Sequence, residues 1–183
     1  MSAKPKRALR LSGVVEELYD RRGQPYLGMM MREPFLGQIA HRLLRSWEGL
    51  DAHRFLTRRR ERNGQQHHIT LVAPPEMTKV IRSRRVVGRQ LSFAVQGAGC
   101  VKAPDGKSYF LLLDAPCADQ LRSLLGLPNK DFHLTLGFSP QDIHTMRKNR
   151  STRILDAQGV EALKNAPMRR FVTRQRRCIV DKR

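Results

Sequence analysis

Acidic residues are scarce in this sequence. Among its 183 residues, 16 Asp and Glu stand against 35 Lys and Arg, which gives a formal net charge of +19. This excess of basic residues excludes a protein surface without a preference for charged partners. It favours a polyanionic partner: RNA, DNA or an anionic membrane. Solubility alone is the alternative explanation of the charge. Aromatic residues make up only 6% of the chain, which argues against extensive base stacking.

Cysteines and long apolar runs are also rare. The sequence has three widely spaced cysteines, Cys100, Cys117 and Cys178, and no two of them form a C-x-x-C motif. Neither a structural zinc site nor a disulfide framework is therefore indicated. The longest apolar runs, such as 110–113, are too short to cross a bilayer, and no apolar segment follows the charged N-terminus as in a secretory signal. We therefore expect a soluble, cytoplasmic protein without membrane association.

The hydrophobic pattern predicts strands that alternate with helices in one domain of ordinary length. The expected strands are 26–31, 67–73, 89–101, 108–114 and 132–138. The expected helices, each of which begins with proline in its first turn, are 34–47, 75–82, 116–125 and 140–148. Turn signals lie at 20–23 and at 104–107, where the second predicts a hairpin. This order predicts an α+β fold, in which the polar segment 48–66 is an exposed loop.

An internal repeat relates the two halves of the chain. His68-Ile69-Thr70-Leu71 and His133-Leu134-Thr135-Leu136 share the frame H-x-T-L-x-x-x-P and lie 65 residues apart. In each half a strand that contains a tyrosine, Tyr26 or Tyr109, precedes a helix that begins with proline, and that helix leads into the H-x-T strand. The first copy holds about 18 additional residues, which we place in the charged loop around 58–64. The repeat predicts two lobes related by a pseudo-twofold axis, with copies at 25–88 and 89–150.

The repeated histidines and threonines form a candidate catalytic set. Residues i and i+2 of a strand share a face, so His68 lies with Thr70 and His133 with Thr135. We expect these polar faces to look toward each other across the interface between the lobes. Two imidazoles beside one phosphate can act as general base and general acid, while the hydroxyls donate to the phosphate oxygens. This scheme requires neither a metal nor a cofactor.

The paired motifs resemble the 2H phosphoesterase superfamily, which includes the LigT-like RNA cyclic phosphodiesterases. The resemblance covers residues 26–148 and assigns the four motif residues to the catalytic positions. It implies a bilobal fold in which antiparallel sheets line a central cleft with helices outside. It also implies metal-independent opening of 2′,3′-cyclic phosphates. Because members of the superfamily attack different bonds with reversed roles, the resemblance does not say which histidine is the base.

These inferences define a bilobal phosphoesterase domain over 25–168, with a basic N-terminal arm and first element at 1–24 and a basic segment at 169–183. We expect a monomer that acts on RNA ends with a 2′,3′-cyclic phosphate. A small cyclic nucleotide is the alternative substrate, and a non-catalytic RNA-binding protein is the alternative class. Basic clusters at 54–62, 79–89, 147–153 and 169–183 are expected to follow a phosphate backbone. The candidate substrate-binding residues are Arg84, Arg85, Arg89, Tyr26 and Tyr109, although core packing is an equal explanation for the tyrosines.

Overall fold

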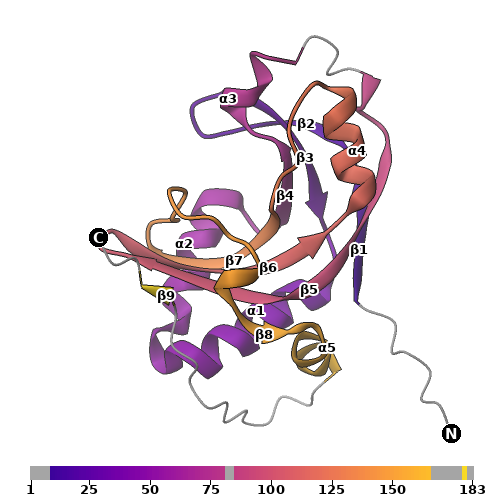
Figure 1. The fold of residues 1–183 in the computed structure, drawn as a ribbon. Coiled ribbons are helices and arrows are strands. Elements are labelled where there is room, and N and C mark those ends of the chain that lie inside the picture. The colour runs from indigo at the N-terminus through magenta and orange to yellow at the C-terminus, as the bar shows by residue number, and fades with distance from the viewer. Residues whose placement is uncertain (1–8, 81–84, 166–178, 181–183) are drawn as a thin grey trace, which may run out of the picture.

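The structure is a computed structural model that describes residues 9–80, 85–165 and 179–180. One curled sheet forms its centre, and helices pack beside it (Figure 1). The strands are β1 (Arg10–Val14), β2 (Glu16–Tyr19), β3 (Pro25–Met31), β4 (His67–Val72), β5 (Gln90–Ala103), β6 (Gly106–Asp114), β7 (Phe132–Pro140), β8 (Arg153–Asp156) and β9 (Ile179–Val180). The helices are α1 (Pro34–Glu48), α2 (Ala52–Asn63), α3 (Pro74–Met77), α4 (Pro116–Leu124) and α5 (Ala157–Asn165), with 3-10 turns η1 (Gly49–Asp51) and η3 (Arg150–Thr152).

The strand order confirms the internal repeat. Across the sheet the order is β1-β5-β6-β7-β4-β3-β2, so β4 and β7 are neighbours at the centre and β3 and β6 flank them. All these pairs are antiparallel, while β8 and β9 add to β5, the latter in parallel. The units β3-α1-β4 and β6-α4-β7 are therefore equivalent halves. The α+β bilobal architecture is confirmed, and its two halves join in one continuous sheet.

The five expected strands correspond to β3, β4, β5, β6 and β7, and the two long helices to α1 and α4. The segment 104–107 forms the β5–β6 hairpin, in which Ala103 lies opposite Gly106. The expected helix at 140–148 is wrong, because β7 continues to Pro140 and no helix follows it there. The short helix expected at 75–82 begins at Pro74 and ends at Met77, and its last expected residues lie outside the described part. Residues 1–8 and most of 169–183 also lie outside it.

The expectation of an exposed loop at 48–66 is wrong as well. These residues form η1 and α2, and α2 buries Ala52, Phe55, Leu56 and Arg59. The buried positions follow the i, i+3, i+4, i+7 spacing of a helix face. Charged residues between them hid this pattern in the sequence. The additional residues of the first copy are therefore an ordered helix that packs against the sheet.

The helices of each half cover the H-x-T strand of the other half. From the first copy, α1 and α2 pack against β7, whereas α4 of the second copy packs against β4 and β5. Arg122 of α4, which is 1% exposed, fixes this contact by donating to the Leu71 carbonyl at 2.6 Å and to Glu76 at 2.7 Å. Both halves consequently share the main apolar core, and a smaller cluster of Val101, Phe110, Leu112 and Ile143 lies apart from it. Neither H-x-T strand is buried without the other copy.

Two further features bear on the expectations above. Among the helices of the described residues, none is both long and apolar enough to span a membrane. Cys117 is free and exposed. Cys100, in contrast, is disulfide-bonded, which the spacing of the three cysteines did not predict.

The close packing of α2 on β7 depends on Gly137. A Cβ atom at this position would lie 2.7 Å from Leu44 Cδ1 and 3.2 Å from the Phe55 carbonyl oxygen. We expect Gly137→Ala to lower the free energy of unfolding by about 1–3 kcal/mol through overpacking. Gly37→Ala is the matched control, because Gly37 lies in α1 with nothing within 4 Å of the added Cβ, and it should stabilise by about 0.5–1 kcal/mol. Urea denaturation measures both, and equal effects would contradict the packing argument.

Candidate active site

The two H-x-T motifs lie side by side on the central strands β4 and β7. These strands are antiparallel, and Ile69 is paired with Leu134. This register sets His68 beside Thr135 and Thr70 beside His133 on one face of the sheet. Ile69 and Leu134 are fully buried on the other face. The four polar residues are thus brought together as expected, but on a shared face of one sheet and not across an interface between separate lobes.

A buried carboxylate stands at the centre of this site. The side chain of Asp142, which is 4% exposed, lies in the segment that follows β7. It accepts hydrogen bonds from Ser108 Oγ at 2.7 Å and, more weakly, from Thr135 Oγ1 at 3.5 Å. It also forms ion pairs with Lys148 Nζ at 2.8 Å and with Arg62 Nη1 at 2.5 Å. Asp142 therefore connects the second motif to two cations from different parts of the chain.

Both cations are held in place by aromatic rings as well as by Asp142. Arg62 comes from the last turn of α2, and its guanidinium lies 4.4 Å from the centroid of Phe138. Lys148, whose side chain is 3% exposed, lies 5.5 Å from the centroid of Phe110. The register shift between β6 and β7 places Ser108 and Phe138 on the same face as the motifs. These contacts fix two positive charges beside the histidines.

The surroundings lower the pKa of both motif histidines. Burial lowers the pKa of His68 to about 4, and Arg62 adds to this effect while Asp142 opposes it. Burial likewise lowers the pKa of His133 to about 3, with Lys148 acting in the same direction and Asp142 against it. For Asp142, the two cations outweigh the effect of burial and hold its pKa well below the usual range. At neutral pH the free site consequently contains two neutral imidazoles, one carboxylate and two cations.

Aromatic side chains border each histidine. Tyr26 is half-buried, and its ring centroid lies 6.0 Å from that of His68. Phe110 lies at the same distance from His133. Tyr26 therefore lies at the site, as the sequence predicted. Tyr109 does not, because it is 1% exposed, stacks on Trp47 at 5.2 Å and donates to Glu48 in the core.

The predicted substrate-binding arginines are not brought to this site. Arg84 lies outside the described residues. Arg85 and Arg89 are exposed and lie beside the junction of β1 and β2, where Val15 bonds to the backbone at Gly88 and Arg89. No contact among the described residues joins either arginine to the motif residues.

Sequence reasoning missed four residues of the site: Arg62, Asp142, His144 and Lys148. Arg62 and Lys148 belong to basic clusters that the sequence showed, but nothing marked these two among their neighbours. His144 lies 3.9 Å from Asp142 and lines, with His133 and Lys148, a pocket of about 240 Å³. Asp142 was hidden inside the segment expected to be a helix. Its only sequence signal is that it is an acidic residue close to the second motif in a chain with few acids.

Comparison with known proteins identifies the family. The model of the 2H phosphoesterase domain described as Swiss Army Knife matches residues 30–144, which is more than half of the chain. The chain belongs to this 2H phosphoesterase family. The match includes both H-x-T motifs and Asp142. Neither the curated proteins nor the solved structures contain a match to this chain. The protein is therefore a phosphoesterase and a hydrolase.

The pH dependence of this phosphoesterase tests the charges around the histidines. A single proton shared by the pair gives a bell-shaped profile, and the lowered pKa values place the maximum of kcat/KM below pH 6.5. Lys148 lowers both imidazole pKa values, so Lys148→Met should move the alkaline limb to higher pH. Asp142 raises both, so Asp142→Asn should move that limb to lower pH.

The measurement is kcat/KM against pH on a chromogenic phosphodiester. Lys102→Met removes an exposed lysine of β5 and serves as the control, with no shift expected. Displacement of the limb in the same direction by both site variants would contradict the assigned electrostatics. Asp142→Asn also leaves the buried Lys148 and the half-buried Arg62 without their carboxylate partner, a change that costs about 3–5 kcal/mol of stability, so folding of this variant is checked by circular dichroism.

Proposed function

We propose that this phosphoesterase opens 2′,3′-cyclic phosphates at RNA ends without a metal, in RNA repair or processing. One neutral imidazole accepts a proton from water as the water oxygen bonds to phosphorus. The bond from phosphorus to the 2′ or the 3′ oxygen then breaks, and the other histidine, as imidazolium, donates a proton to that oxygen. The observation that carries this proposal is the adjacent placement of His68, Thr70, His133 and Thr135 on one face of β4 and β7.

The groups around the histidines suit an anion whose charge grows during the reaction. Lys148 and Arg62 are fixed cations, and the threonine hydroxyls are donors of the kind that stabilise developing charge on non-bridging oxygens. The hydrogen bond of Thr135 to Asp142 is long, at 3.5 Å, so this hydroxyl is able to turn toward a phosphate. A bound phosphate also favours the protonated form of a nearby imidazole. Substrate binding thereby supplies the acid that the free site lacks.

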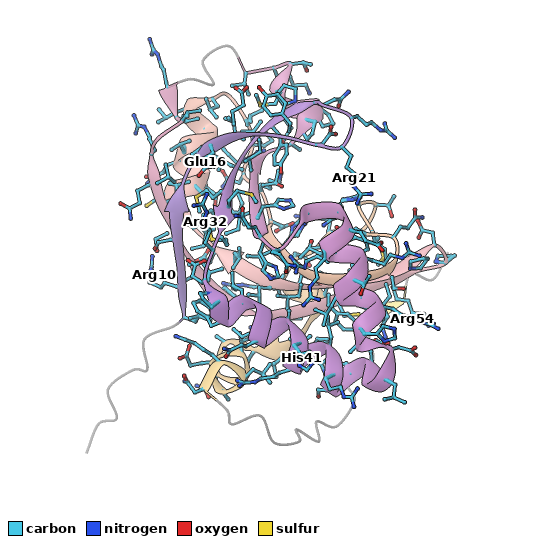
Figure 2. The ribbon with its side chains drawn as sticks, turned by 180° about the vertical axis from the view of Figure 1, so that it is seen from behind. Arg10, Glu16, Arg21, Arg32, His41 and Arg54 are labelled. Atoms are coloured by element: carbon cyan, nitrogen blue, oxygen red, sulfur yellow. The ribbon has the colours of Figure 1, made fainter. Side chains whose placement is uncertain are left out.

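The distribution of basic residues favours RNA over a small cyclic nucleotide. Arg54, Arg58 and Arg62 of α2 are spaced four residues apart and so share one side of the helix. Arg54 and Arg58 are exposed, and Arg62, in the last turn, enters the site. Figure 2 shows Arg54 on the outer side of α2, with Arg21 near its other end, where Arg21 donates to the Glu61 carbonyl. Such a row of cations is typical of a surface that follows successive phosphates. A cyclic mononucleotide has only one phosphate and would leave this row unused.

Two alternatives remain distinct from this proposal. A phosphodiesterase of small cyclic nucleotides would use the same motif chemistry, but the arginines of α2 would not contribute to substrate binding. A non-catalytic RNA-binding protein, which belongs to another class, would keep the contribution of α2 and lose turnover. The complete set of four motif residues beside fixed cations argues for catalysis, because binding alone does not require two paired imidazoles.

The proposal predicts activity on a defined RNA. In EDTA, an oligoribonucleotide that ends in a 2′,3′-cyclic phosphate should be converted to a single phosphomonoester, identified by end-group analysis. We expect His68→Ala and His133→Ala each to lower turnover by about 10²–10⁴-fold, since each removes one proton-transfer partner. Thr70→Val and Thr135→Val should cost less, about 10–10³-fold.

His41→Ala is the control for these variants, because His41 lies on the exposed side of α1, and it should retain the rate of the parent. Near-parental rates in either motif-histidine variant would reject two-histidine catalysis. Loss of activity in EDTA with recovery on adding a divalent ion would reject the metal-independent scheme.

Salt dependence separates the RNA substrate from the small one. Each phosphate contacted on a single strand contributes a slope of about −0.7 to the plot of log affinity against log salt. KM for an RNA of ten nucleotides should therefore rise steeply with salt, and KM for a cyclic mononucleotide much less. Replacing Arg54 and Arg58 by Gln should flatten only the RNA plot. Equal slopes for both substrates in the parent would favour the small-nucleotide alternative.

A further inference from the structure

The two central strands of the sheet are joined by very little backbone pairing. Over the described residues, β4 pairs with β3 along nearly its whole length, and β7 does so with β6. Between β4 and β7, which carry the two motifs, Ile69–Leu134 is the single register pair in this part of the chain. The two copies of the repeat meet at this seam. Whatever fixes β4 against β7 therefore also fixes the spacing of the motif histidines.

Buried side chains bond to the backbone on both sides of this single pair. On one side, the Leu71 carbonyl accepts a hydrogen bond from Arg122 of α4 at 2.6 Å. On the other side, the Thr135 carbonyl oxygen lies 3.2 Å from Nδ1 of His67. Because buried backbone carbonyls require hydrogen-bond partners, both side chains complete the seam where backbone pairing stops. The bond of His67 reaches a residue of the second motif from the strand of the first.

His67 occupies a position that ordinarily takes an apolar side chain. It shares a face of β4 with Ile69, which is 1% exposed, and is itself 4% exposed. The equivalent residue of the second copy, directly before its motif, is Phe132. Phe132 packs on Phe93 in the core, with ring centroids 5.3 Å apart. A histidine at the equivalent position of the first copy therefore requires an explanation other than apolar packing.

The hydrogen bonding of His67 supplies that explanation. A carbonyl oxygen only accepts, so Nδ1 carries the proton of the ring. Burial lowers the pKa of His67 to about 4, and Arg59 acts in the same direction, so the ring is neutral at neutral pH and Nε2 carries no proton. Nε2 is buried without a hydrogen-bond partner among the described residues, which costs free energy. Within this part of the chain, the bond to Thr135 is the one hydrogen bond that the ring makes.

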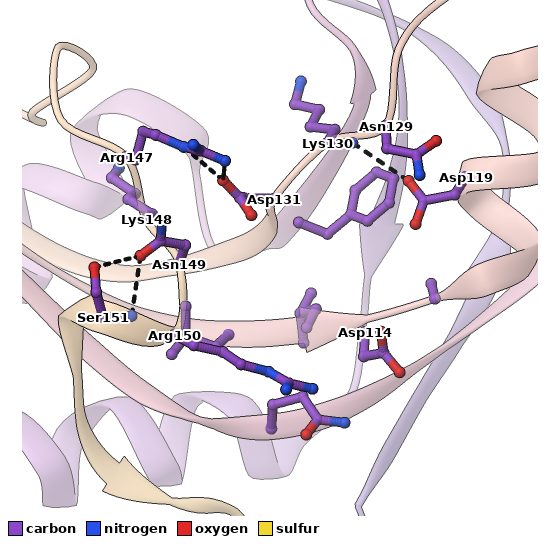
Figure 3. A pocket seen from close by; sticks show the side chains of 15 residues that line it. Asp114, Asp119, Asn129, Lys130, Asp131, Arg147, Lys148, Asn149, Arg150 and Ser151 are labelled. Carbon is purple, nitrogen blue, oxygen red and sulfur yellow. Dashed lines mark hydrogen bonds and ion pairs between the residues drawn. The ribbon is translucent and has the colours of Figure 1, made fainter.

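The ion pair at the start of β7 does not perform the same task. Asp131, directly before β7, pairs with Arg147 at 2.7 Å beside a groove of about 530 Å³, as Figure 3 shows. Both residues are exposed, and exposed ion pairs contribute little to stability. Both also belong to the second copy, so their contact does not reach β4. The spacing between the motif strands depends on the buried contacts of the seam.

We propose that His67 is a positioning residue for the active site. Its Nδ1–H holds the Thr135 carbonyl and thereby fixes β7, which carries His133, against β4, which carries His68. This role rests on the proposed function, because it assumes that the motif residues perform the reaction. Proton transfer to and from one phosphate depends steeply on geometry, and a misplacement of about 1 Å can lower a rate by about 10²-fold. His67 faces the core and not the motif face, so its loss should change kcat more than KM.

The test compares two replacements of His67 in the hydrolysis of a chromogenic phosphodiester. His67→Asn keeps an N–H donor on the atom attached to Cγ, as in histidine, and should retain kcat within about threefold of the parent. His67→Leu fills a similar volume without a donor and should lower kcat by about 10–100-fold while KM changes by less than about twofold. His53→Leu is the matched control, because Nδ1 of His53 also bonds to a backbone carbonyl, that of Leu50 at 2.9 Å, but at the exposed start of α2. It should keep the parental kcat.

Nitrogen-15 NMR of the parent adds a readout that needs no variant, and it decides the question together with His67→Asn if His67→Leu fails to fold. The neutral ring of His67 should carry its proton on Nδ1. A proton on Nε2, a parental kcat in His67→Leu, or a loss of more than about tenfold in His67→Asn would overturn the positioning role. A parental rate in His133→Ala rejects the proposed function instead. The usual loss in His133→Ala beside a parental kcat in His67→Leu rejects only the positioning role.

Discussion

The ion pairs of Asp142 with Lys148 and Arg62 are the interaction on which the rest of the site depends. Taking a carboxylate and an ammonium out of water costs several kcal/mol for each ion, and only close mutual contacts offset this cost. Asp142 and Lys148 are 4% and 3% exposed, so each would be strongly destabilising without the other. In a chain with a net charge of +19, the single carboxylate of Asp142 holds two cations close to the histidines and at the same time balances part of their positive charge.

The same ionic cluster explains why the site without substrate lacks a protonated histidine that can act as general acid. Burial lowers the pKa of His68 to about 4, with Arg62 and Lys148 acting in the same direction, and burial together with Lys148 lowers the pKa of His133 to about 3, so that neither imidazole carries a proton at neutral pH. The charge balance of the site changes when a phosphate binds, because the anion favours an imidazolium beside it. Acid–base chemistry that needs one neutral and one protonated histidine is then established by the substrate itself. A neutral ligand would leave both imidazoles unprotonated.

The sequence was sufficient for the features that depend on local periodicity. Alternation predicted which side of β4, and of β7 as far as Thr135, is polar, and the repeated frame predicted that the strands are equivalent. Beyond Thr135 the expected alternation is wrong, because the register shift turns Phe138 to the same face as the motifs. It was insufficient where tertiary contacts decide. The helix α2 is held by Phe55 and Leu56 against β7, which a composition dominated by arginine conceals. The segment after Pro140 contains no helix, and within it Asp142 belongs to a buried ionic cluster. No local signal in the sequence indicates the lysine and arginine that pair with Asp142 there.

The duplication also shows how a symmetric arrangement becomes suited to an asymmetric reaction. Two identical halves would place the two histidines in identical surroundings, yet the proposed reaction needs them in different protonation states. Here the cation that chiefly affects His68 is Arg62, from a helix present only in the first copy, whereas the one that chiefly affects His133 is Lys148, from the segment after the second motif. Tyr26 borders one histidine and Phe110 the other. The added helix therefore does more than fill space in the first copy: it makes the two imidazoles chemically distinct.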